Sequence, residues 1–151
     1  MKQFLKSPTV NAVCISLFSA FYWLLFGLQA GTTDYEWLKY YDGNASFWSS
    51  WSDLILDGFL MVIANILIGV TILVVVLLIV RRKPYDEYHT SILTNCLVVA
   101  AVLTLIAIAV FYWIVLSEPF WIGGKFTLFI VIHWTTVVFA NLTYVLLCRW
   151  R

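Results

Sequence analysis

One histidine in an apolar run is the side chain of this sequence best suited to chemistry. His133 stands in the run at residues 125–148. A histidine moves protons or activates a nucleophile, but Ser-His-acid chemistry needs a nucleophile and an orienting carboxylate within hydrogen-bond reach. Thr136 and Asp57 have the right chemical types, yet nothing in their spacing brings them to His133. The pattern favours a hydrogen bond between helices over catalysis.

Other polar side chains also lie at membrane depth. At helical spacing Asn141 shares a face with His133, and Asn65 shares one with Asp57. Polar groups are costly in hydrocarbon and normally turn toward the centre of a bundle. We therefore predict that His133 and Asn65 face one interior at similar depth. The predicted polar interior comprises His133, Asn65, Thr136, Asn141 and Asp57.

Two short motifs resemble those of a family of membrane proteins, some of which are threonine/histidine lipid hydrolases. The motifs are Ala-Asn-Ile-Leu at residues 64–67 and Ile-His at residues 132–133. The threonine expected just before the asparagine is absent, since residues 61–63 read Met-Val-Ile. Val137 replaces the proline expected four residues after the histidine. The nucleophile is therefore missing and the family is not adopted. A lipid-directed intramembrane enzyme that uses His133 is the alternative function.

The composition requires a lipid solvent for these residues. The chain has 151 residues, of which 63% are hydrophobic and 11% charged, whereas a soluble domain carries about 25% charged residues. A membrane-crossing helix needs about 20 apolar residues. The sequence therefore predicts an all-α fold, a four-helix transmembrane bundle that forms a single domain. The predicted helices are at about 9–29, 53–80, 87–116 and 125–148.

The distribution of cations orients the predicted bundle. Arg81, Arg82 and Lys83 lie between the second and third apolar runs, and seven of the nine Lys and Arg residues fall on this side of the membrane. Cytoplasmic loops carry such an excess. We therefore predict that both termini are cytoplasmic, in a plasma or bacterial inner membrane. The three adjacent cations predict contacts with anionic lipid rather than with nucleic acid.

The segments between the apolar runs carry their own signals. Residues 30–52 are rich in aromatic rings and predict a loop or a short helix on the outer surface. Pro84 and Asp86 predict the start of the third helix, and Pro119 with the glycines at 123–124 predicts a break before the fourth. Residues 21–23 and 111–113 both read Phe-Tyr-Trp. This repeat favours two tandem helical hairpins.

No cofactor or metal site is predicted. Cys14, Cys96 and Cys148 match no metal-ligand spacing with His89. The segments outside the membrane are too small to hold a site, and small-residue faces occur on several helices, where they let backbones approach. The sequence thus favours a protein that works by helix association, as a homo-oligomer or an accessory subunit. A narrow transport path between helices is compatible with this function.

Overall fold

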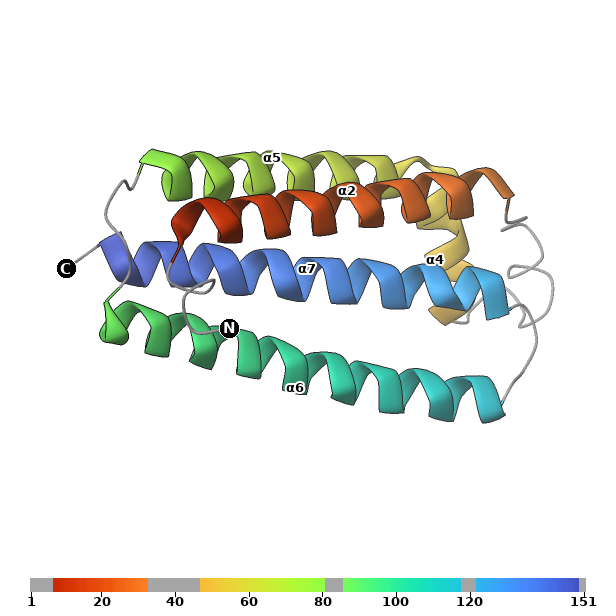
Figure 1. Ribbon diagram of the computed structural model, residues 1–151. Helices are drawn as coiled ribbons and strands as arrows, with labels where there is room; N and C mark the ends of the chain where they lie inside the picture. Colours follow the sequence, from red (N-terminus) through yellow and green to blue (C-terminus); the bar gives the residue numbers. More distant parts are fainter. Residues whose placement is uncertain (1–6, 33–46, 81–85, 118–121, 150–151) are drawn as a thin grey trace.

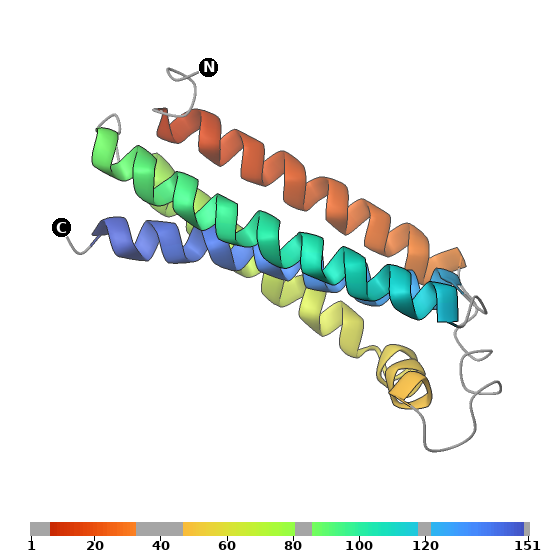
Figure 2. The same ribbon diagram turned by 90° about the horizontal axis from the view of Figure 1, so that it is seen from below.

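The computed structural model describes residues 7–32, 47–80, 86–117 and 122–149. These residues form helices α2 (Pro8–Thr32), α4 (Phe47–Leu56), α5 (Phe59–Val80), α6 (Glu87–Ser117) and α7 (Ile122–Arg149). Four of them, α2, α5, α6 and α7, are long and apolar enough to cross a membrane, and they lie side by side in alternating directions (Figures 1 and 2). The predicted all-helical bundle with four spans is confirmed.

One end of the bundle gathers four helix ends. The starts of α2 and α6 and the ends of α5 and α7 lie there together (Figure 1). This arrangement agrees with an even number of crossings. The side of the membrane that this end faces stays a prediction from the charges. The basic turn, with Arg81, Arg82 and Lys83, lies outside the described residues.

The helices pack as two pairs, which α7 joins together. The most extensive contacts join α6 to α7 and α2 to α5, and α7 also packs on α5 and α2. Each pair consists of helices that the predicted tandem hairpins would join. In contrast, α6 packs mainly on α7 and lies at one flank of the bundle, opposite α5 (Figure 1).

The inner face of α5 follows a spacing of alternately four and three residues. Its buried residues are Leu60, Ala64, Leu67, Thr71, Val74 and Leu78. This spacing keeps one stripe against neighbouring helices. In the stripe, the hydroxyls of Thr71 and Ser19 of α2 form a buried hydrogen bond of 3.0 Å, and Thr71 donates to the Leu67 carbonyl at 2.8 Å. Thr71, the single polar residue of this stripe, therefore has its hydrogen-bonding groups satisfied by α2 and by α5 itself.

The predicted second helix at 53–80 is wrong, because two helices occupy this range. They meet at Gly58, whose φ of 77° lies in the left-handed region that favours glycine. The N–H of Gly58 donates to the Ile55 carbonyl at 3.0 Å and ends α4. Helix α4, which precedes this glycine, runs across the end of the bundle (Figures 1 and 2). The last part of the predicted aromatic segment, residues 47–52, belongs to this short helix.

The fourth helix starts earlier than the predicted boundary near residue 125. Gly123 and Gly124 lie inside its first turn instead of breaking the chain. The Gly123 carbonyl accepts from Nε2 of Gln29 in α2 at 2.8 Å, and the Gly124 carbonyl accepts from Nε1 of Trp51 in α4 at 3.4 Å. These tertiary bonds hold the helix start against α2 and α4.

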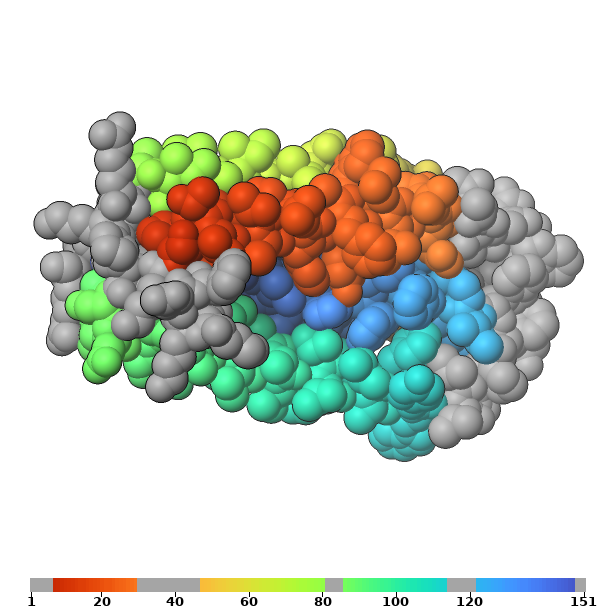
Figure 3. Space-filling view, in the orientation of Figure 1, coloured from red at the N-terminus to blue at the C-terminus, as the bar shows by residue number. Residues whose placement is uncertain are grey.

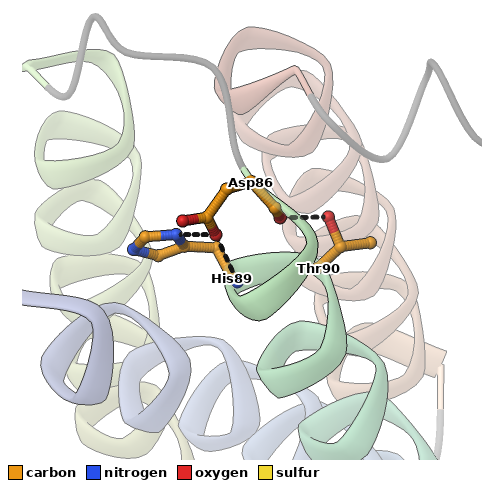
Figure 4. Close-up of polar contacts among 3 residues, drawn as sticks. All are labelled: Asp86, His89 and Thr90. Carbon is orange, nitrogen blue, oxygen red and sulfur yellow. Dashed lines mark hydrogen bonds and ion pairs between the residues drawn. The ribbon is translucent and has the colours of Figure 1, made fainter.

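The third helix begins at the predicted position. Oδ1 of Asp86 accepts from the backbone N–H of His89 at 2.9 Å and also contacts Nδ1 of the His89 ring (Figure 4). The hydroxyl of Thr90 donates to the Asp86 carbonyl at 2.9 Å. Asp86 is therefore the N-cap of α6, which satisfies a backbone donor left open at the helix start.

Acid is expected to loosen the first turn of α6. The hydrogen bond from the His89 backbone N–H, together with the contact to its ring, holds the pKa of Asp86 below its ordinary value of 3.8. A lowered pKa in the folded state means that the carboxylate stabilises the turn above pH 3.8 and stops doing so as the pH falls toward the lowered pKa. Amide hydrogen-exchange protection of this turn, corrected for intrinsic rates, should fall in that range.

The matched control for this titration is Asp86→Asn. Asparagine caps helices about as well as aspartate but does not titrate. Its protection factor should therefore not change between neutral and acid pH. An equal acid loss in both proteins would assign the loosening to another group.

Candidate functional site

His133 joins α7 to α2 by a hydrogen bond. Its Nδ1 pairs with the hydroxyl of Tyr22, and both side chains are half-buried. The two rings meet edge-on with centroids 5.2 Å apart. Phe18 and Phe129 also contact the imidazole, with centroid distances of 5.8 and 5.9 Å. The imidazole is thus held among three aromatic rings from α2 and α7.

This geometry brings no predicted catalytic partner to the imidazole. The hydroxyl of Thr136 donates to the Ile132 carbonyl of its own helix at 2.7 Å. Asp57 is exposed between α4 and α5. Among the described residues, the hydrogen-bond partner of His133 is Tyr22, and no group of three metal-binding side chains occurs there. Within that part of the chain, the observed arrangement is an interhelical joint.

The predicted common face of Asn65 and His133 does not form. Asn65, Asp57, Met61 and Gly69 are all exposed. Asn65 directly follows Ala64, which is 2% exposed, and one residue turns the helix by about 100°. Ala64 therefore packs inward, and Asn65 points away from the bundle with Met61 and Gly69. The prediction of Asn65 and Asp57 in a polar interior is wrong for the single molecule.

Asn141 lies on α7 and is half-buried. Its amide donates to the Val137 carbonyl of the same helix at 2.9 Å. This bond lies within α7 and joins no second helix. Tyr144, three residues further along α7, is 1% exposed.

Sequence reasoning missed a buried lysine. Lys125 is only 3% exposed, and its Nζ lies 5.1 Å from the centroid of a Trp48 ring. The buried face of α4 consists of Trp48, Ser49, Trp51, Ser52 and Ile55, and this helix covers the start of α7. The sequence signal that could have predicted this burial is the spacing of Trp48, Trp51 and Ile55, which places them on one face of a helix.

No family model, no curated protein and no solved structure matches the chain. The four apolar spans make it a small multi-pass membrane protein. What it does must therefore be inferred from its own side chains.

Breaking the Tyr22–His133 pair is expected to loosen the contact between α2 and α7. Tyr22→Phe keeps the ring and removes the hydroxyl, and His133→Phe removes the acceptor or donor nitrogen. Each should lower the free energy of unfolding, with a coupling between them of about 0.6–1.7 kcal/mol, as found for hydrogen bonds between membrane helices. Reversible unfolding of the four proteins in mixed micelles gives this coupling.

The cycle also bears on the alternative function. Strictly additive effects would show that the pair contributes no bond of its own. A His133 variant that keeps its stability and assembly but loses a lipid-directed activity would favour the enzyme. The interhelical role instead predicts that stability and assembly change together.

Proposed function

We propose that this protein works by self-association through the exposed face of α5, which carries Asn65 and Gly69. The supporting observation is the position of Asn65. It is exposed on the most apolar of the four spans, and its side chain forms no hydrogen bond within the described part of the chain. A carboxamide facing lipid has lost its water partners. A second helix is a natural source of new ones.

The depth of Asn65 requires such a partner. The residue lies six positions after the start of α5, or about 9 Å along a helix that rises 1.5 Å per residue. In a hydrocarbon core of about 30 Å, this depth is beyond the headgroups. The short side chain of asparagine cannot reach water from there as a lysine does.

A second copy of the chain supplies a matching group. Copies with the same orientation in the membrane place their Asn65 side chains at one depth, and a two-fold axis along the membrane normal brings them face to face. Each carboxamide carries N–H donors and an oxygen acceptor, so the carboxamides of two copies can satisfy each other. The partner with the best chemical match is therefore the chain itself.

Gly69 lies one turn further along the same face. A Cβ added at this position would meet nothing within 4 Å in the single molecule. In membranes, a small residue such as glycine lets helix backbones approach closely, and an asparagine side chain forms hydrogen bonds across the contact. Asn65 and Gly69 therefore form a compact contact surface on the exposed face of α5, the helix that lies opposite α6 in the bundle (Figure 1).

The wider proposal places this assembly in a plasma or bacterial inner membrane with both termini in the cytoplasm. Arg81, Arg82 and Lys83 then hold anionic lipid at the cytoplasmic face. The assembly is a homo-oligomer, or the chain is an accessory subunit that offers the same face to another membrane protein. A narrow transport path would run between copies. The His133 enzyme is the alternative.

Replacing Asn65 with leucine tests the proposal. The change removes two carboxamide hydrogen bonds from a symmetric dimer, each worth about 0.6–1.7 kcal/mol. The dissociation constant should therefore rise about tenfold to several hundredfold. Energy transfer between labelled copies in liposomes measures it.

The matched control is Thr94→Leu, because Thr94 is also an exposed polar residue of a span but lies on α6, where its hydroxyl donates to the Thr90 carbonyl at 2.8 Å. This variant should keep the dissociation constant of the natural chain. Equal affinities for Asn65→Leu and the natural chain would exclude α5 as the contact surface. Equal weakening by both variants would also contradict it.

A further inference from the structure

The seam between α6 and α7 contains two hollows. The larger, about 410 Å³, is lined by Asn95, Ala100, Thr136 and neighbouring residues, and the smaller, about 200 Å³, by Ala107, Phe129 and Lys125 among others. Leu103 lines both, so they follow one another along the seam. A gap between the surfaces of α6 and α7 is visible toward the C-terminal end of α6 (Figure 3).

We propose that this seam binds an anionic phospholipid, with an acyl chain between α6 and α7 and the head group at Lys125. The proposal uses a flank of the bundle that the α5 contact does not use. The walls of the seam are mostly aliphatic and aromatic, and hydroxyl and amide groups appear only at the end distant from Lys125. These walls suit a hydrocarbon chain.

The charge at one end selects the head group. Lys125 lines the smaller hollow in the first turn of α7, and Trp48, which also lines it, places a ring face toward the ammonium group. Tryptophan favours the headgroup level of a membrane. A cation held at this level attracts a phosphate of the opposite charge. The side chains at the end of the seam are therefore complementary to an anionic head group.

The dimensions of the seam suit a lipid chain. Its lining residues on α6 extend from Asn95 to Phe111, which corresponds to about 24 Å of helix. A leaflet is about half of the 30 Å hydrocarbon core, or about 15 Å. The seam is longer than this, so it can hold an acyl chain that enters at Lys125. A flexible acyl chain can follow the two hollows of about 410 and 200 Å³ in turn.

Lipid binding to the purified full-length chain tests the charge. The protein is stripped of lipid in mild detergent, and its affinities for phosphatidylglycerol and phosphatidylcholine are measured by native mass spectrometry. Lys125→Gln should weaken the binding of phosphatidylglycerol about fivefold and leave the affinity for phosphatidylcholine unchanged. Lys125→Arg should keep the preference. An unchanged preference in Lys125→Gln would overturn the proposal.

A second pair of variants tests the hydrocarbon part. Ala107 lines the smaller hollow, whereas Ala109 is exposed on the same helix outside both hollows. Ala107→Phe should lower the binding of both lipids, and Ala109→Phe should not, with folding of each checked by circular dichroism. Equal lipid binding by the two variants would contradict an acyl chain in the seam.

The same variants distinguish other occupants. Glycerol phosphate should not displace phosphatidylglycerol, because it has no chain to fill the seam; full displacement would show a site for phosphate esters alone. A loss of dimer in Ala107→Phe with lipid retained would assign the seam to a second copy and overturn the lipid proposal.

Discussion

Replacing Gly69 with isoleucine is expected to abolish self-association while leaving the single molecule folded. The residue is exposed, and a Cβ there would contact nothing within 4 Å, so the monomer has room for a larger side chain. At a contact between two α5 helices, however, the added branched chain would sit where the backbones approach. Overpacking typically costs about 1–3 kcal/mol per site, or about 2–6 kcal/mol for two copies.

A second glycine gives a matched control for this effect. Gly27 of α2 is also exposed within a span and has nothing within 4 Å of an added Cβ. Gly27→Ile therefore makes the same chemical change, with the same gain in helix propensity, on a helix that the proposal leaves outside the contact. Dissociation constants in liposomes compare the two variants. A dimer that survives Gly69→Ile, or is lost equally in Gly27→Ile, would contradict the proposed contact.

Replacing Trp134 with alanine is expected to be the most damaging change to the fold itself. Trp134 is 1% exposed and lies in the buried cluster formed by α2, α4, α5 and α7. Its ring contacts Tyr22 and Phe26, each with a centroid distance of 6.4 Å. Lipid tails are as apolar as the core, so packing supplies much of the stability of such a bundle. A Trp→Ala cavity costs about 3–5 kcal/mol.

Two further variants isolate the packing term. Trp113 on α6 is 75% exposed, so Trp113→Ala should leave the free energy of unfolding nearly unchanged. The indole Nε1 of Trp134 is buried and has no hydrogen-bond partner within the described residues. Trp134→Phe should therefore retain most of the stability, since it loses volume but no bond. Reversible unfolding in mixed micelles measures all three, and equal losses at positions 113 and 134 would contradict the observed packing.

Local features of the sequence determined where the spans lie. A run of apolar residues of the right length is by itself enough to predict a crossing, and α5 and α6 end and begin at Val80 and Glu87 as predicted. The cap at Asp86 was also predictable, because its bonds to His89 and Thr90 reach only three or four residues along the chain. The break at Gly58 was less visible, since apolar residues continue through it.

Only the tertiary structure decided which face of each span turns inward. In water, an apolar stripe identifies the buried side of a helix. In a membrane both the lipid and the core are apolar, so α5 carries little such contrast, and its sequence alone does not favour Ala64 over Asn65 as the buried residue. The choice follows from how α2, α5 and α7 fit together. That fit also pairs His133 with Tyr22 and leaves Asn65 exposed, and it is the packing of α4 across the bundle end that buries Lys125.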